Sequence, residues 1–292
     1  MADYAPAYYA LGLTWRFQAD TEEKAIAAFK RYAQLMPLDP RPWREMSSIF
    51  ETAKRVNEAE NAFRESLNRD RENIDPHVEI VAFYLRQTQP EKARESLATA
   101  LKQLPDANAV FRAVDGQIMH QDEDTTPEMA QLFEALLISF PKELSSSWDG
   151  LRGLSEAQRT QKKYDVAIKT LQKVVALQPD GGDQTTIASI YRETRRFPPA
   201  LLAATQAIKQ DPESSEGYFE RACALTQLGR KREAIAALTK AIEFNKFIVH
   251  RLESEDDLKP LAALPSFKAL LPKEEEPENE AASPPQSKAA NQ

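Results

Sequence analysis

The chain has 292 residues, a formal net charge of −7 and a single cysteine. One cysteine excludes an internal disulfide framework, and the negative charge gives no electrostatic reason to expect a nucleic acid partner. No apolar run approaches the roughly 18 residues needed to span a bilayer, and the start, MADYAPAYYALG, lacks the cationic lead-in of a signal segment. These features predict a cytoplasmic protein, with an exported region of a longer chain as the alternative.

Alanine, leucine and glutamate outnumber the β-branched residues and glycine is scarce, which favours helix over sheet. One pattern recurs along the chain: a small residue, an apolar residue four positions later, usually another at seven, and often a proline at twelve. The series is Ala25, Phe29, Tyr32; Ala59, Phe63, Ser66; Ala93, Leu97, Ala100; Met129, Phe133, Leu136; Ala167, Leu171, Val174; Ala200, Ala204, Ala207; and Ala234, Leu238, Ala241. Its period of about 34 residues indicates stacked helix pairs.

In chain order, this period predicts seven repeats near residues 5–39, 40–73, 74–106, 107–146, 147–180, 181–213 and 214–246. The fourth is degenerate, because Met129 stands in the alanine place and the polar connection HQDEDTTP before it is long. The connection ends with Thr126, a plausible helix cap, and Pro127 at the first helical position.

The seventh repeat shows the pattern most clearly, in the stretch Tyr218–Phe244. Two apolar helical stripes flank Gly229, which is suited to a left-handed helix end. Beyond it, residues 247–272 keep apolar residues without the period, and we predict capping helices that cover the last pair. Residues 273–292 carry five glutamates and two lysines with no apolar periodicity, so we predict a disordered acidic tail.

Several motifs resemble those of the tetratricopeptide repeat family. The family's Leu-Gly pair, opening aromatic and later tyrosine are matched by Leu11-Gly12, Trp43, Tyr84 and Tyr191. The resemblance covers roughly residues 5–246 and implies an all-α fold, a right-handed α-solenoid of about seven helix-turn-helix repeats plus C-terminal capping helices. The stretch DLKPLAALPSFKALL also resembles the short closing helix of many bacterial arrays of this family.

The first residues, 5–12, read like a junction between two repeats, with no amphipathic cap before them. We therefore expect another chain, or preceding repeats, to cover the N-terminal face of the array.

Candidate catalytic residues are few. His77, His120 and His250 lie far apart, and none has a second ligand at metal-binding spacing. Cys223 lies among alanines on a predicted helix, where a small buried residue is favoured over a nucleophile. The glycines of Asp180–Asp183 form a turn without the Gly-Lys-Ser/Thr of a phosphate loop. The sequence therefore predicts no enzyme activity, no metal site and no cofactor.

In the resembled family the first helices of the repeats line a concave groove that binds peptides. Placing the small residue of each second helix in register gives the candidate groove residues Arg44, Ser48, Val78, Ala82, Arg152, Glu156, Arg159, Thr185, Ser189, Arg192 and Phe219, followed by Cys223. The four arginines could bind carboxylates of an acidic peptide, and the alternative is ordinary solvated helix charge. The lysine and asparagine pattern with which the family's co-chaperones grip the acidic tail of heat-shock chaperones is absent here.

Two functions remain open from the sequence. The first is a non-catalytic scaffold or adaptor that binds a peptide or partner protein in the groove as part of a multiprotein complex. The second is an accessory or regulatory region of a larger enzyme or sensor chain.

Overall fold

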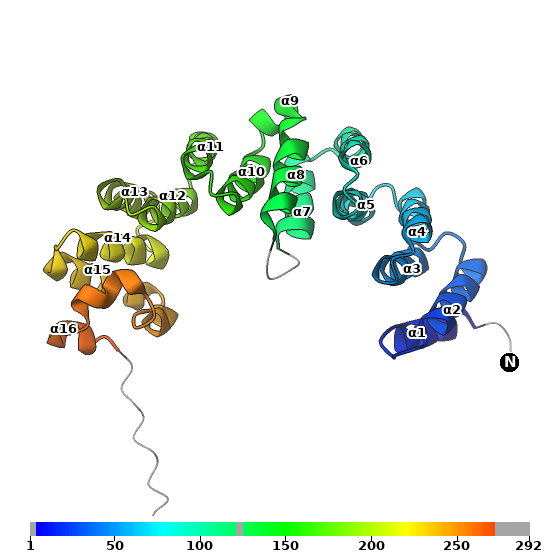
Figure 1. The fold of residues 1–292 in the computed structure, drawn as a ribbon, viewed down its shortest axis with the longest axis horizontal. Coiled ribbons are helices and arrows are strands. Elements are labelled where there is room, and N and C mark those ends of the chain that lie inside the picture. The colour runs from blue at the N-terminus through cyan, green and yellow to red at the C-terminus, as the bar shows by residue number, and fades with distance from the viewer. Residues whose placement is uncertain (1–3, 121–124, 272–292) are drawn as a thin grey trace, which may run out of the picture. The chain divides into compact units, whose positions relative to one another are not determined.

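The computed structural model describes residues 4–120 and 125–271, and within these ranges the chain contains helices and no strand (Figure 1). It divides into two compact units, Met1–Pro179 and Asp180–Gln292. The predicted all-α array of helical repeats is confirmed. The predicted acidic tail, 273–292, lies outside the described residues.

Unit 1 consists of helix pairs that follow one another along the chain (Figure 1). The pairs are α1 (Ala5–Arg16) with α2 (Glu22–Leu35), α3 (Arg41–Thr52) with α4 (Val56–Arg69), α5 (Ile74–Arg86) with α6 (Pro90–Gln103), and α10 (Trp148–Thr160) with α11 (Tyr164–Leu177); between the last two come α7 (Ala107–Met119), α8 (Pro127–Ile138) and the short α9 (Pro141–Ser145).

Unit 2 contains two further pairs and a closing segment. The pairs are α12 (Gly182–Glu193) with α13 (Phe197–Gln210) and α14 (Ser215–Gln227) with α15 (Lys231–Phe244); the closing elements are η1 (Lys246–Arg251), η2 (Asp256–Leu261) and α16 (Pro265–Lys268).

An alanine at the fourth position of each second helix is buried, and in every pair except α7 with α8 it lies at the seam between the paired helices. Each of these alanines is at most 1% exposed: Ala25, Ala59, Ala93, Ala130, Ala167, Ala200 and Ala234. A methyl side chain keeps the interaxial distance short, because nothing larger separates the two backbones. In the first pair the approach is closer still, since a Cβ added at Gly12 would lie 2.6 Å from the Phe29 ring.

The turn between the two helices of a pair uses one left-handed residue at a fixed place, five positions before the seam alanine. This residue has φ between 52° and 59° in five pairs and φ of 76° in the last: Asp20, Lys54, Thr88, Lys162, Arg195 and Gly229. Only glycine adopts this conformation without steric cost. The left-handed turn expected at Gly229 therefore recurs in five other pairs, where a residue less suited to positive φ stands in place of glycine.

The fourth repeat departs from the pattern, and the predicted register there was wrong by one residue. Met129 is only partly buried, whereas Ala130 is fully buried and takes the seam position. The reason is packing: α8 makes little contact with its expected partner α7, and both helices pack against α10 instead. The buried side of α8 is therefore set by α10, and Phe133 and Leu137 fill it.

The closing segment packs on the apolar end of the last pair. Leu258, Leu261 and Phe267 are buried in one core with Leu238 of α15 and Phe219 of α14. Two of the three closing elements are 3-10 helices, η1 and η2, and proline lies inside the second of these at Pro260.

At the other end, α1 has only Gly12 fully buried. Leu11 of α1 and the flanking Tyr4 and Phe17 are exposed apolar side chains. This is the surface on which we expected further cover.

Gly229→Ala should destabilise unit 2 through the backbone alone. No heavy atom of the described residues lies within 4 Å of the added Cβ, so the cost is that of an alanine with positive φ, about 1–2 kcal/mol. Urea unfolding followed by far-ultraviolet circular dichroism measures it. Gly116→Ala is the control, because Gly116 also has open space but helical geometry inside α7; it should be neutral or stabilising by up to about 1 kcal/mol. Equal effects of the two substitutions would contradict the role given to Gly229.

Candidate functional site

The first helices of unit 1 enclose an open groove of about 760 Å³. It lies along α1, α3 and α5, the first helices of the first three pairs. Its lining consists of Tyr9 and Arg16 from α1; Arg41, Arg44, Glu45, Ser47, Ser48, Glu51 and Thr52 from α3; Glu79 and Arg86 from α5; and Phe63 and Gln117. Most of these side chains are polar, so the groove is suited to a polar ligand rather than to an apolar one.

One set of ion pairs crosses this groove from α1 to α3. Arg16 is ion-paired with Glu45 and donates to Ser48 Oγ at 3.0 Å. Tyr9 donates its hydroxyl proton to the same Glu45 at 3.3 Å. The Glu45 carboxylate is thus held between two side chains of the neighbouring first helix.

A second set joins α3 to α5. Arg44 donates from Nε to both carboxylate oxygens of Glu79, at 3.0 and 3.2 Å, and lies 3.5 Å from Asp75. Arg86 donates to both oxygens of Glu51 at 2.8 and 3.0 Å. Such two-pronged arginine–carboxylate bonds fix orientation as well as charge. Together with the pair of Arg16 and Glu45, they link the three first helices of the groove to one another.

The end of the groove near Arg41 contains a compact hydrogen-bonded group. Arg41 donates to Asp39 from Nε and Nη2, and to the Tyr32 hydroxyl at 2.7 Å. Tyr32 in turn donates to Asp39 at 2.6 Å. Burial opposes ionisation of Asp39, but the bonds from Arg41 and Tyr32 outweigh it and lower the pKa of this carboxyl to about 2.

Two of the predicted groove residues in unit 1 line the groove, namely Arg44 and Ser48. Val78 and Ala82 do not: both are buried in the core of unit 1, and the expectation that they face a ligand was wrong. Their side chains are short and lie under neighbouring helices, so a first-helix position close to the groove is not sufficient for exposure. Arg152, Glu156 and Arg159 lie half-buried on α10 and do not line this groove.

In unit 2, Thr185 and Ser189 of α12 are half-buried. Phe219 and Cys223 are fully buried on α14, so the predicted exposure of Phe219 was wrong as well. The physical reason lies in the closing segment: the guanidinium of Arg251 stacks over the Phe219 ring, 4.1 Å from its centroid. Burial also raises the pKa of the Cys223 thiol well above its usual range, which disfavours a reactive thiolate.

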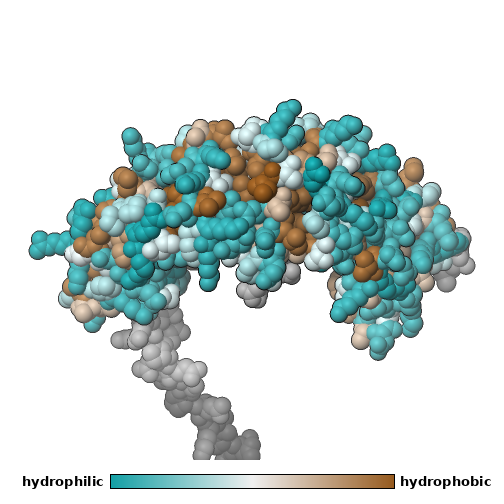
Figure 2. Space-filling view, turned by 45° about the horizontal axis from the view of Figure 1, so that its top comes forward, coloured by the Kyte–Doolittle hydropathy of each residue, from teal (hydrophilic) through white to brown (hydrophobic). Residues whose placement is uncertain are grey.

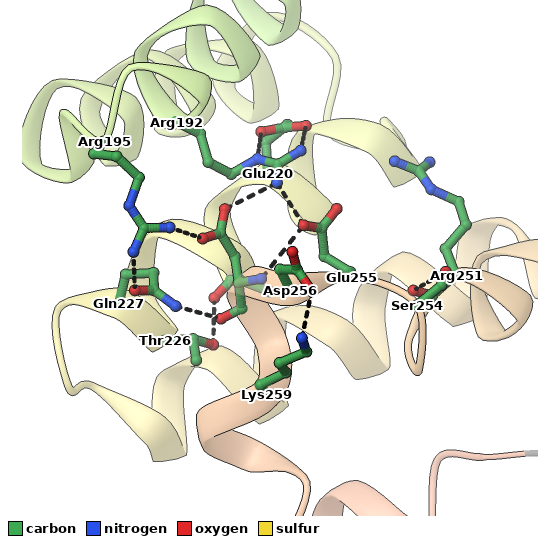
Figure 3. Close-up of polar contacts among 12 residues, drawn as sticks. Arg192, Arg195, Glu220, Thr226, Gln227, Arg251, Ser254, Glu255, Asp256 and Lys259 are labelled. Atoms are coloured by element: carbon green, nitrogen blue, oxygen red, sulfur yellow. Dashed lines mark hydrogen bonds and ion pairs between the residues drawn. The ribbon is translucent and has the colours of Figure 1, made fainter.

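Arg192 is the most extensively bonded of the predicted residues (Figure 3). It donates to both carboxylate oxygens of Glu220 at 2.8 and 3.2 Å, to Glu255 at 2.8 Å and to Asp257 at 2.9 Å. The Arg192 side chain is only 15% exposed. Its ion pairs therefore stabilise the fold, and its guanidinium is not open to a ligand in a groove. Burial outweighs the bonds from Arg192 and raises the pKa of Glu220.

The sequence does not by itself identify the glutamates that pair with Arg44 and Arg192, which are Glu79 and Glu220. Arg16, Glu51 and Arg86 also line the groove without having been predicted to do so. A signal was available for the glutamates: Glu45, Glu79 and Glu220 each stand fourteen positions before a seam alanine. A charged residue repeated at one place in the 34-residue period marks one face of the first helices.

The described residues contain no group of three or more histidine, cysteine or acidic side chains that could hold a metal ion. Within the same part of the chain, every helix is too short or too polar to cross a membrane. The face of the molecule seen in Figure 2 is mostly hydrophilic, with hydrophobic residues in several small groups between the hydrophilic ones.

Successive helix pairs with a small residue at each seam define the class of helical repeat proteins. Three segments of the sequence, residues 50–114, 149–181 and 185–246, match models described as tetratricopeptide repeat. The chain belongs to the tetratricopeptide repeat family. A search of curated proteins gives no match.

Among solved structures, the chain is similar to a crystal structure of MamA protein, with 16% identity, 74% of this chain and 95% of that chain covered, and a TM-score of 0.37. It is similar to YrrB, described as a TPR protein with an unusual peptide-binding site, with 14% identity, 78% and 97% covered, and a TM-score of 0.35. The TPR2AB-domain:pHSP90 complex of yeast Sti1 gives 16% identity, 88% and 98% covered, and a TM-score of 0.35.

The Asp39 group predicts acid sensitivity in the first repeats. The pKa of Asp39 is about 2 in the folded chain and near 3.8 in the unfolded chain, so its contribution is present above about pH 4 and is lost as the pH falls through about 2. Asp39→Asn should remove a pH-dependent contribution on the order of 2 kcal/mol, measured by urea unfolding between pH 5 and pH 2. A variant whose stability falls with acid as steeply as that of the wild type would contradict this.

Proposed function

We propose that the protein is a non-catalytic protein–protein interaction scaffold and that a peptide or extended segment of a partner binds in the groove of unit 1. The observation that carries the proposal is the groove itself, an open volume of about 760 Å³ lined by polar side chains from three successive first helices. Tetratricopeptide repeats form interaction scaffolds, and each first helix adds a row of side chains to a continuous surface. The scaffold acts as one part of a multiprotein complex.

The charges of the groove favour a partner segment with both signs of charge. Four arginines and three glutamates line it, so its formal charge nearly balances. Arg16, Arg44 and Arg86 already have carboxylate partners on neighbouring helices. A purely acidic ligand must displace those glutamates and leave them without a counter-charge, which costs free energy. A segment with alternating charges can exchange partners with both members of each pair, so we favour it over the purely acidic peptide that the arginines alone suggested.

Thr52→Trp tests the groove directly. Thr52 is exposed and lines the groove, and its hydroxyl donates to the Ser48 carbonyl at 2.9 Å. An indole there fills space that the partner needs without breaking an ion pair of the groove. Partners retained by the wild-type chain should be identified by mass spectrometry and titrated as purified proteins; the variant should bind at least about tenfold more weakly.

Thr99→Trp is the matched control. Thr99 is likewise exposed, on the second helix α6, and its hydroxyl donates to the Glu95 carbonyl at 2.9 Å. It should leave affinity unchanged. If Thr52→Trp binds as tightly as the wild type, or if both variants lose binding equally, the groove is not the binding surface.

A further inference from the structure

The first-helix face that forms the groove of unit 1 is covered in unit 2. Glu45 and Glu79, which line the groove of unit 1, stand at the same repeat position as Glu220 on α14, fourteen residues before a seam alanine. Their side chains are 19% and 17% exposed, whereas that of Glu220 is 5% exposed. The same face of the repeat is thus accessible in one unit and buried in the other.

The chain's own closing segment provides this cover through two carboxylates (Figure 3). Glu255 accepts from Arg192 at 2.8 Å, and Asp257 accepts from Arg192 and Arg195 at 2.9 Å each. Gln227 adds a bond to the main-chain carbonyl of Asp257 at 2.8 Å. Side chains of α12, of the turn that follows it and of α14 therefore bind both the acidic groups and the backbone of the segment, as a peptide site does.

Apolar side chains follow directly after the two acids. Leu258 and Leu261 are at most 1% exposed and belong to the same core as Phe219 and Cys223 of α14. The recognised pattern is therefore acid, any residue, acid, leucine, two further residues, and leucine. Charge fixes the register of the segment and the two leucines supply buried area.

We propose that this face of unit 2 is a second binding site, specific for an acidic segment followed by leucines, and that residues 246–271 occupy it in cis. A partner with the same pattern binds there when the chain's own segment leaves. In the closed state the intramolecular segment competes at high effective concentration, so the site is inaccessible to a free peptide. The inference concerns α12 and α14 and does not rest on the function proposed for the groove of unit 1.

Asp257→Lys in the full-length chain should open the site. The substitution removes two charge-assisted bonds and adds a cation beside Arg192 and Arg195. Hydrogen exchange measured by mass spectrometry should show residues 246–271 exchanging at least about tenfold faster, while α12 to α15 stay protected. A fluorescent peptide of residues 246–271 with the native sequence should then bind this variant saturably and should not bind the wild type.

Asp256→Lys provides the matched control, with the same change of charge one residue away. The Asp256 side chain is 80% exposed and pairs with Lys259 at 2.7 Å, whereas Asp257 pairs with Arg192 and Arg195. This variant should keep the segment protected and leave the peptide unbound. A peptide that itself carries Asp257→Lys should bind none of the chains.

Failure of the peptide to bind Asp257→Lys while α12 to α15 remain protected would overturn the proposal and leave the segment as a permanent cap only. If α12 to α15 lose protection in that variant, Asp257→Asn decides: its smaller perturbation should still raise peptide binding above that of the wild type, and no rise overturns the proposal. Thr52→Trp in the same chains is the control for binding of the peptide to the groove of unit 1, and it should leave peptide binding unchanged.

Discussion

The closeness of the two helices in each pair is the constraint on which the remaining structure depends. An alanine at the fourth position of the second helix is buried in all seven repeats of the described chain, and in the fourth repeat α10 takes the place of the first helix as the packing partner. Because a larger side chain would force the axes apart, this position fixes the rotation of both helices. Once the rotation is fixed, residues at a constant distance before the alanine must share one face of the first helices. The groove and its ion pairs follow from that register.

The same face serves differently in the two units. In unit 1 the pairs of Arg16 with Glu45 and of Arg44 with Glu79 join neighbouring first helices and leave space above them. In unit 2 Arg192 makes the equivalent bond to Glu220 and also binds two carboxylates of the closing segment. The closing segment thus has two effects: it buries the apolar end of the last helix pair, and it fills a polar surface that a partner would otherwise contact.

The fold could be predicted from the spacing of small residues because that spacing reports a local packing requirement. Single side chains of the site were harder to predict. Arg44 and Ser48 line the groove, whereas Val78 and Phe219 are buried. The partners of Arg192 on the closing segment lie 63 and 65 residues away in sequence, so no periodicity within the repeats indicates them. The register of the fourth repeat failed for a related reason, since α10 rather than α7 determines which side of α8 is buried.

Thiol labelling compares the two units most directly. Ser48 and Cys223 both stand eleven positions before a seam alanine, Ser48 in the groove of unit 1 and Cys223 buried in unit 2. The measurement is the rate at which a neutral maleimide modifies Cys223 in the native chain and the introduced cysteine in Ser48→Cys/Cys223→Ser, followed by intact mass. If the face is accessible in unit 1 and covered in unit 2, position 48 should be labelled at least about tenfold faster than Cys223. The reason is that a buried thiol reacts only after the protein opens locally. Equal rates at the two positions would contradict this account.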